Sequence, residues 1–290
     1  MNAPGPPQGG LGIFTVSFFR FPKVLMRMPS IIALRRAQLL LAALACVVTA
    51  PVFAGAEFSA VTKNTNTGTR LPAFGDVIVD GAVDNEHGRL EYRESGAGSL
   101  PKGSIVVTTD GARTAKLYNV EEHTCGEVPV LSSAPTGMRA QAAALTRYEN
   151  VEIKKTLDAK GPKLHGSATR HLRYTTTYDV HPSGPAAKVL RGSIESDVWV
   201  APALTDPAFA LWLNAAPHTG NPDADRKIAD AMGDAKGAAL KRVQRTSLQL
   251  EGGKEQVSTT TMEVTRLSTQ RPSAKALEPP FVCRIGPSKE

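Results

Sequence analysis

The side chains that could carry catalytic chemistry form no recognisable catalytic motif. The chain has 6 histidines, which are spread over separate segments: His87, His123, His165, His171, His181 and His218. It contains no Gly-x-Ser-x-Gly, no His-Glu-x-x-His, no phosphate-binding loop and no Gly-x-Gly-x-x-Gly. From the motifs we therefore predict no catalytic residue, no metal site and no cofactor.

Two segments place a carboxylate beside an imidazole, Glu86-His87 and Glu121-Glu122-His123. Adjacent residues of a strand point to opposite faces, so neither segment is a ready acid–base pair. We interpret both as surface loops. His171 is the residue around which a hydrolytic site could assemble from distant residues, because it lies at the turn-proximal end of a predicted central strand. Such a site would need a carboxylate or serine within hydrogen-bond reach and an adjoining pocket.

Cys125 and Cys283 belong to no Cys-x-x-Cys motif, and the nearest histidine, His123, is a weak metal signal when it stands alone. An isolated pair of cysteines in an exported protein typically forms a disulfide. We predict a Cys125–Cys283 bridge that fixes the segment 278–283 to the rest of the domain. The alternative is two independent thiols that pack in the core as small apolar side chains.

The densest apolar and aromatic stretch runs from 172 to 212 and could line a cavity between a sheet and helices. The sequence predicts a site for a lipid or other apolar ligand from six residues: Leu172, Tyr174, Tyr178, Trp199, Phe209 and Trp212. The alternative is that these side chains are simply the core.

The elements that must position these residues are mostly strands. Short apolar or alternating segments between turn residues predict strands at 76–80, 89–93, 103–109, 115–120, 151–157, 170–180, 194–200, 240–250 and 256–267. Asp110-Gly111 predicts a hairpin between two of them. Within 170–180, alternation places Leu172, Tyr174, Thr176 and Tyr178 on one face.

Three segments predict helices. The segment 138–149 carries Met138, Ala142, Leu145 and Glu149 on one helical face. Asp206-Pro207 and Asn221-Pro222 each combine an N-cap residue with proline at the first helical position. The pattern predicts a mainly β fold with some α: one curved antiparallel sheet, an open half-barrel, with two or three helices on one face. Residues 57–290 are expected to form a single domain.

Residues 1–54 have the pattern of a secretory signal peptide. Arg35 and Arg36 precede the apolar run 39–48, and Val52-Phe53-Ala54 fits the small-x-small cleavage pattern. The run is shorter than the ~20 residues that span a membrane. We therefore predict a periplasmic or secreted protein that is not transmembrane after cleavage.

Two details of this leader leave alternatives open. The part before the apolar run is long, and Met26 or Met28 would begin a leader of ordinary length. Cys46 could carry a lipid anchor, but Ala43 and Leu44 stand in the reverse of the order typical of lipoprotein signals. Lipidation through Cys46 is therefore the less favoured prediction.

The basic character of the chain comes from this leader. The chain has 34 basic and 27 acidic residues, and 5 of the basic ones lie in 1–56, which holds no acid. The remainder carries 29 basic and 27 acidic residues with mixed signs. Nucleic-acid binding needs a basic patch on the folded domain, so we predict no nucleic-acid partner.

Three short motifs resemble those of a family of uncharacterised secreted bacterial proteins, domain of unknown function 4412. They are the turn and strand from Gly161-Pro162 to His171, the strand end Asp197-Val198-Trp199-Val200, and Lys236-Gly237-Ala238-Ala239-Leu240. The similarity covers about 90–285. The family is more remotely similar to periplasmic lipoprotein carriers of the LolA/LolB type, which implies an open half-barrel with helices on its concave face.

Together these observations predict a non-enzymatic periplasmic envelope protein that binds an apolar ligand or a partner protein. Two alternatives stay open. One is an envelope hydrolase with a site around His171, and the other is a purely structural or interaction module.

Overall fold

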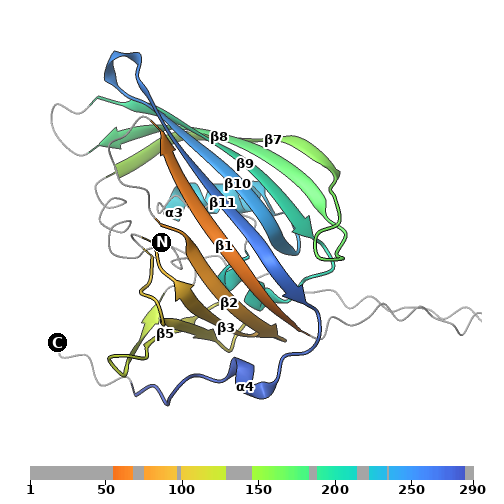
Figure 1. Cartoon of the computed structure of the whole chain (residues 1–290). Coiled ribbons are helices and arrows are strands. Elements are labelled where there is room, and N and C mark those ends of the chain that lie inside the picture. Colours follow the sequence, from red (N-terminus) through yellow and green to blue (C-terminus); the bar gives the residue numbers. More distant parts are fainter. Residues whose placement is uncertain are drawn as a thin grey trace, which may run out of the picture. The chain divides into compact units, whose positions relative to one another are not determined.

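The domain is built on one open antiparallel sheet of 11 strands (Figure 1). The structure is a computed structural model that describes residues 55–67, 75–96, 99–128, 146–182, 188–213, 222–233 and 235–284. Its strands are β1 Ala56–Thr67, β2 Val77–Asp84, β3 His87–Glu94, β4 Ile105–Thr108, β5 Ala115–Asn119, β6 Thr124–Val128, β7 Thr146–Lys160, β8 Arg170–Pro182, β9 Leu190–Ala201, β10 Ala238–Gln249 and β11 Glu255–Ser268. The prediction of a single curved antiparallel sheet that does not close is confirmed.

The strand order is β6-β5-β4-β3-β2-β1-β11-β10-β9-β8-β7. Every pairing therefore joins consecutive strands except that of β1 with β11, which lie side by side in the middle of the sheet (Figure 1). The hairpin predicted at Asp110-Gly111 is present, because β4 and β5 pair on either side of it. The segment 151–157 lies within the edge strand β7, as predicted.

Two strands, β1 and β6, were not predicted, and one predicted helix is partly wrong. Residues 129–145, which hold most of the predicted helix 138–149, lie outside the described residues. Its last residue, Glu149, belongs to strand β7 and pairs with Asp179 of β8. A strand forms here because β8 offers this segment a full row of backbone hydrogen-bond partners.

The helices on the inner side of the sheet begin where the sequence predicts. Asp206 accepts a hydrogen bond from the backbone N–H of Ala208 at 2.9 Å and caps η2, Pro207–Leu211, which is a short 3-10 helix. The helix α3, Pro222–Ala231, begins at the predicted proline, while Asn221 lies outside the described residues. Ile228 and Met232, which lie four residues apart, are both buried. Two further short helical segments, η3 Glu251–Gly253 and α4 Ala274–Leu277, follow later in the chain.

One face of the sheet, which we call the inner face, holds the main apolar core. On β8 the predicted alternation is confirmed, because Leu172, Tyr174, Thr176 and Tyr178 are all buried. Side chains from η2 and α3 complete the core against those of the sheet: Phe58, Val79, Leu90, Tyr92, Leu172, Val198, Leu240, Met262, Phe209, Leu211 and Ile228. Each large apolar side chain that is fully buried contributes about 1.5–3 kcal/mol, so this cluster is a major source of stability.

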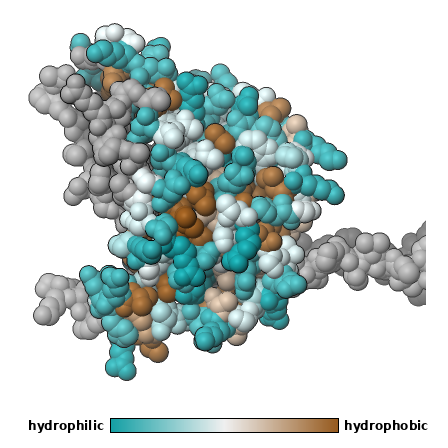
Figure 2. Space-filling view, in the orientation of Figure 1, coloured by the Kyte–Doolittle hydropathy of each residue, from teal (hydrophilic) through white to brown (hydrophobic). Residues whose placement is uncertain are grey.

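The opposite, outer face is mostly hydrophilic where it is seen over β1, β2 and β11, and its apolar spots are small and separate (Figure 2). Ion pairs cross it between neighbouring strands. Asp80 on β2 accepts hydrogen bonds from Ser59 Oγ at 2.6 Å and from Arg93 Nε at 2.8 Å. Burial raises the pKa of Asp80, but these hydrogen bonds outweigh it, and the pKa lies below its ordinary value.

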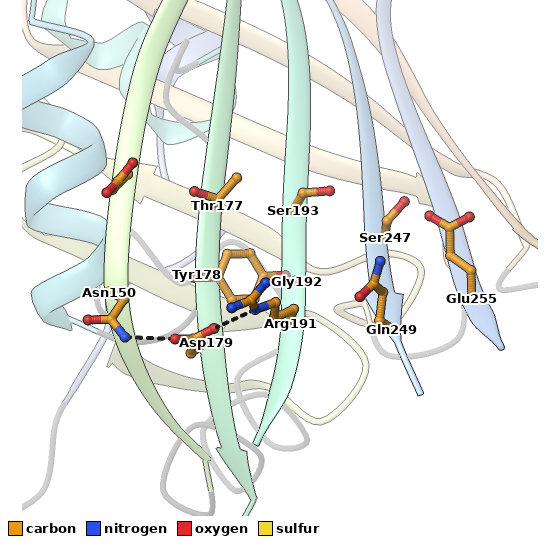
Figure 3. A pocket seen from close by; sticks show the side chains of 11 residues that line it. Asn150, Thr177, Tyr178, Asp179, Arg191, Gly192, Ser193, Ser247, Gln249 and Glu255 are labelled. Carbon is orange, nitrogen blue, oxygen red and sulfur yellow. Dashed lines mark hydrogen bonds and ion pairs between the residues drawn. The ribbon is translucent and has the colours of Figure 1, made fainter. Parts of the chain in front are cut away.

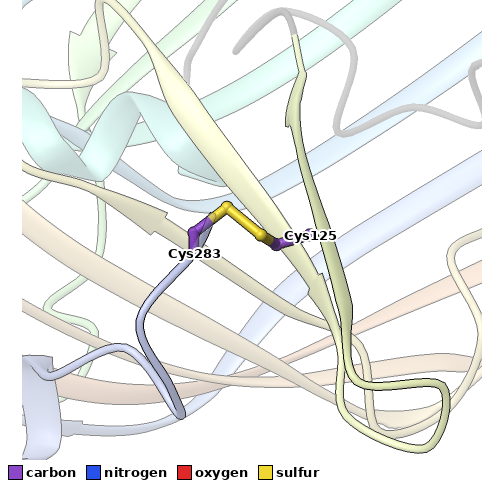
Figure 4. The surroundings of a disulfide bond; sticks show 2 residues. All are labelled: Cys125 and Cys283. Atoms are coloured by element: carbon purple, nitrogen blue, oxygen red, sulfur yellow. A yellow bond between two sulfur atoms is a disulfide. The ribbon is translucent and has the colours of Figure 1, made fainter. Parts of the chain in front are cut away.

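Cys125 of β6 and Cys283 of the C-terminal segment form a disulfide, with Cα atoms 5.7 Å apart (Figure 4). The predicted bridge is thus present in the structure. Next to it, the ring of Phe281 lies edge-on to Tyr118 and stacks on His123. The C-terminal segment therefore covers a small apolar cluster of β4 and β5, made of Ile105, Val107 and Tyr118.

No helix among the described residues is long and apolar enough to cross a membrane. The predicted leader, 1–54, lies outside the described part of the chain.

Candidate functional site

His171 lies on the outer face within a cluster of charged and aromatic side chains. Its Nε2 is 2.6 Å from Asp197 Oδ1 of β9, and the same oxygen accepts a hydrogen bond from Arg173 Nε at 2.9 Å. The imidazole stacks on Trp199 with ring centroids 4.3 Å apart and an interplanar angle of 9°. Lys241 Nζ lies 5.7 Å from the centroid of the same Trp199 ring.

This cluster supplies the carboxylate that a hydrolytic site around His171 would need, but not the rest of such a site. Catalysis by a histidine–carboxylate pair requires a nucleophile within reach of the imidazole. No serine, threonine or cysteine hydrogen-bonds to His171 among the described residues. Asp197 also pairs with Arg173, as in an ordinary ion-pair network. The geometry therefore gives the hydrolase hypothesis little support.

The six residues predicted to line an apolar site do not lie together. Four belong to the main inner cluster: Leu172, Tyr174 and Phe209 are buried in it, and Trp212 packs against it. Tyr178 lies in a separate small cluster with Val180 and Ile194, and its ring centroid is 5.3 Å from that of Tyr148.

Trp199 is the clear correction among these six, because it lies on the outer face. It pairs with His171 across the strands, whereas its neighbours Val198 and Val200 are buried on the inner face. Alternation along the strand already implied this, since Val198 and Trp199 cannot point to the same side. Trp199 therefore cannot share an inner cavity with Leu172.

The four inner residues lie under a cover made by η2, α3 and the residues just after η2. Phe209 of η2 lies 6.1 Å from Phe58 of β1 between ring centroids, and Trp212 is edge-on to Tyr92 of β3 at 5.7 Å. The cover is anchored to the sheet at one end by Asp206. The described inner cluster is thus a filled apolar surface between the sheet and two short helical elements.

A groove of about 550 Å³ crosses the outer face near one end of the sheet (Figure 3). Its lining is largely polar and comes from strands β7 to β11: Asn150, Glu152, Thr177, Tyr178, Asp179, Arg191, Gly192, Ser193, Ser247, Gln249 and Glu255. Asn150 Nδ2 donates to Asp179 Oδ2 at 2.7 Å, and Arg191 Nε lies 3.9 Å from Asp179 Oδ1. Sequence reasoning missed this groove, because it depends on the register of five strands.

Tyr178 borders the groove and is almost fully buried. Burial, together with the neighbouring Tyr148, raises the pKa of Tyr178 to about 12. The phenol therefore stays protonated at any physiological pH and acts as a packed side chain and not as an acid–base group.

In the described part of the chain, no group of three or more His, Cys, Asp or Glu side chains could hold a metal ion. A scan of the chain against protein-family models gives no match, and a search of curated proteins gives none either.

Proposed function

We propose that the chain is a non-enzymatic binding protein of the bacterial cell envelope and that it takes an apolar ligand, such as a lipid acyl chain, on its inner face. The observation that carries the proposal is the apolar inner surface of an open sheet under a cover of two short helical elements. An open sheet lets a ligand reach this surface when the cover moves, without breaking any strand pairing.

The cover is small enough to be exchanged for a ligand. It places Phe209, Leu211 and Ile228 on the sheet, and an acyl chain would offer apolar surface of the same kind. Burial of the apolar surface of the ligand would then offset the free-energy cost of removing these side chains from the sheet. The resemblance to LolA/LolB-type carriers supports the same arrangement, and the Cys125–Cys283 disulfide suits an oxidising compartment.

The test is to purify the full chain from the cell envelope and look for bound lipid. Native mass spectrometry and solvent extraction should reveal an apolar ligand, and delipidated protein should take up an apolar fluorescent dye. Phe209→Ala should change the dye affinity severalfold, because Phe209 lies in the cover. Phe281→Ala is the matched control on the outer face, and it should leave dye binding unchanged.

Protein that carries no lipid and takes up no dye would overturn the apolar-ligand proposal. A structural or partner-binding role would then be favoured. Equal effects of Phe209→Ala and Phe281→Ala would place the dye elsewhere than the inner face.

A further inference from the structure

A row of hydrogen-bonding side chains crosses the inner face beside the apolar cluster. The register places five residues in line, each opposite the next on the neighbouring strand: Tyr174, Ser196, Gln244, Thr260 and Asn64. We call this set the polar row. Tyr174 and Ser196 are each 1% exposed, so the row faces the interior. Neighbouring strands lie ~4.8 Å apart, which lets adjacent members of the row bind one small chemical group.

Ser196 is the most informative member of the row. Its Oγ is buried, and none of the described residues hydrogen-bonds to it. A buried hydroxyl without a partner is unfavourable, because it has lost its hydrogen bonds to water. At the other end of the row, Thr260 Oγ1 donates to Asn64 Oδ1 at 2.6 Å, which leaves the amide N–H groups of Asn64 outside this bond. The row therefore has polar groups suited to an additional oxygen-rich partner.

Arg242 adds a positive charge to the same face. It lies two residues before Gln244 on β10, and its cross-strand partners are the buried apolar residues Val198 and Met262. A guanidinium keeps its charge at all physiological pH values and binds phosphate or carboxylate with two parallel hydrogen bonds. None of the five residues of the polar row is acidic. The flanking row of Arg242 includes Asp158 of the edge strand β7, whose carboxylate accepts hydrogen bonds from Arg170 Nε at 2.7 Å and from Lys155 Nζ at 2.9 Å.

Resting on the proposed function, we propose that the ligand is amphipathic and that the polar row with Arg242 binds its anionic, oxygen-rich head group. The apolar chain of such a ligand would lie on the adjoining cluster around Leu172 and Met262. The row of Arg242 belongs to this apolar region, since Leu172, Val198 and Met262 lie in line with Arg242, and it borders the polar row directly. The inner face thus changes from apolar to polar within two neighbouring rows, which matches the two ends of one amphipathic molecule.

The experiment compares two probes that differ only in a phosphate, 1-dodecanoyl lysophosphatidic acid and 1-dodecanoyl glycerol. Binding of each to the delipidated full chain is measured by calorimetry, and inorganic phosphate is the third probe. We expect the phosphate-bearing lipid to bind about tenfold tighter, as a charge-assisted hydrogen bond implies. Arg242→Gln should abolish this preference and leave binding of the neutral lipid unchanged. Arg245→Gln, on the exposed side of the same strand, should keep it.

The outcomes separate this inference from the proposed function. Equal affinity for the two lipids in the unaltered protein would overturn the head-group site, while lipid binding itself would stand. No binding of either lipid would overturn the proposed function. Inorganic phosphate that binds alone as tightly as the phospholipid would overturn the amphipathic ligand in favour of a simple anion site.

Ser196→Ala tests the head-group site independently of Arg242. It should weaken the phosphate-bearing lipid severalfold and leave the neutral lipid unaffected. Retained binding of the neutral lipid shows that each variant is folded. A Ser196→Ala protein with the full preference, together with an Arg242→Gln protein that also keeps it, would overturn the proposal.

Discussion

The carboxylate of Asp206 accepts a hydrogen bond from the backbone N–H of Asn85 at 2.6 Å, although 121 residues separate them in sequence. Asn85 and Glu86 form the turn between β2 and β3, and both have positive φ, 52° and 76°. Such a turn is suited to a two-residue hairpin, but glutamate rarely adopts it. The second carboxylate oxygen of Asp206 contacts the N–H of Glu86 at 3.4 Å and that of Ala208 at 2.9 Å. One side chain thus caps η2 and fastens the inner cover to a strained turn of the sheet.

Asp206→Ala should loosen the cover. The variant loses a helix cap and the bonds to the turn, so we expect the free energy of unfolding to fall by about 1–2 kcal/mol. If the cover opens for ligand, apolar dye should also bind faster. Asp223→Ala is the control, because the ion pair of Asp223 with Arg226 in α3 is exposed to solvent, and its loss should cost about 0.5 kcal/mol or less. Urea unfolding and stopped-flow dye uptake measure the two effects, and equal losses in both variants would contradict the anchoring role.

Gly192→Ala should destabilise the sheet. A Cβ atom at Gly192 would overlap the ring of its cross-strand partner Tyr178 and lie 2.8 Å from the phenol oxygen. The buried ring would have to move, and overpacking of this kind costs about 1–3 kcal/mol. Gly126→Ala in β6 is the matched control, because no atom lies within 4 Å of the added Cβ. Thermal unfolding should show a lower Tm for the first variant and an unchanged or higher Tm for the second.

The turn around Asp110 should weaken in acid. Hydrogen bonds from the backbone N–H and the hydroxyl of Thr114 are the leading causes that lower the pKa of Asp110 to about 2. An unfolded aspartate titrates near ~3.9, so the ionised form stabilises the fold above that pH. This stabilisation is lost as the pH falls from about 4 to about 2. An NMR titration of the Asp110 carboxyl should show the low pKa, and Thr114→Val should move it upward. A midpoint near 4 in the unaltered protein would contradict the prediction.

Reduction of the Cys125–Cys283 bridge should release the C-terminal segment. In protein cleaved near Ala54, which lacks Cys46, we expect no thiol to react before reduction and two to react afterwards, with a loss of about 2–4 kcal/mol in stability. Ile105, Val107 and Tyr118 would lose their cover, so limited proteolysis should cut the C-terminal segment of the reduced protein faster than that of the oxidised protein. Labelling of both thiols in the protein as isolated would show that the bridge does not form.

Ser196→Ala should leave the ligand-free protein as stable as before or slightly more stable. The substitution removes a buried hydroxyl that has no partner among the described residues, and such a group costs about 1–3 kcal/mol. Ser59→Ala is the control, because Ser59 Oγ donates to Asp80 at 2.6 Å, and it should lose about 1 kcal/mol. A large loss of stability in Ser196→Ala would show that the hydroxyl is satisfied and would remove the reason to expect a ligand atom there.

Local patterns predicted most strands because burial on one face imposes a period of two on the sequence, as on Leu172, Tyr174 and Tyr178. Strand β1 was missed since its inward residues beyond Ala60 are polar, Thr62 and Asn64, and give no apolar alternation. The site was less predictable than the fold. Density of aromatic residues suggested one cavity, but Trp199 points outward.

The polar row could not be found from local sequence at all. Ser196, Gln244 and Asn64 come from distant segments, and only the register of the strands between them brings them into line. The outer groove depends on register in the same way. Alternation along a strand predicts on which side of the sheet a residue lies. It does not predict which residues of the neighbouring strands lie opposite it.

The pairing of β1 with β11 sets the order in which this sheet can assemble. Each of the two meanders, β1 to β6 and β7 to β11, pairs strands that are consecutive in the chain, and the connection from β9 to β10 also carries η2 and α3. The central seam alone joins residues as far apart as Glu57 and Ser268, and it is the entropically expensive step. Because these two residues are opposite each other, a short turn could link the end of β11 to the start of β1. A circular permutant with that link, opened between β6 and β7, would make every pairing join consecutive strands and should fold faster than the natural order.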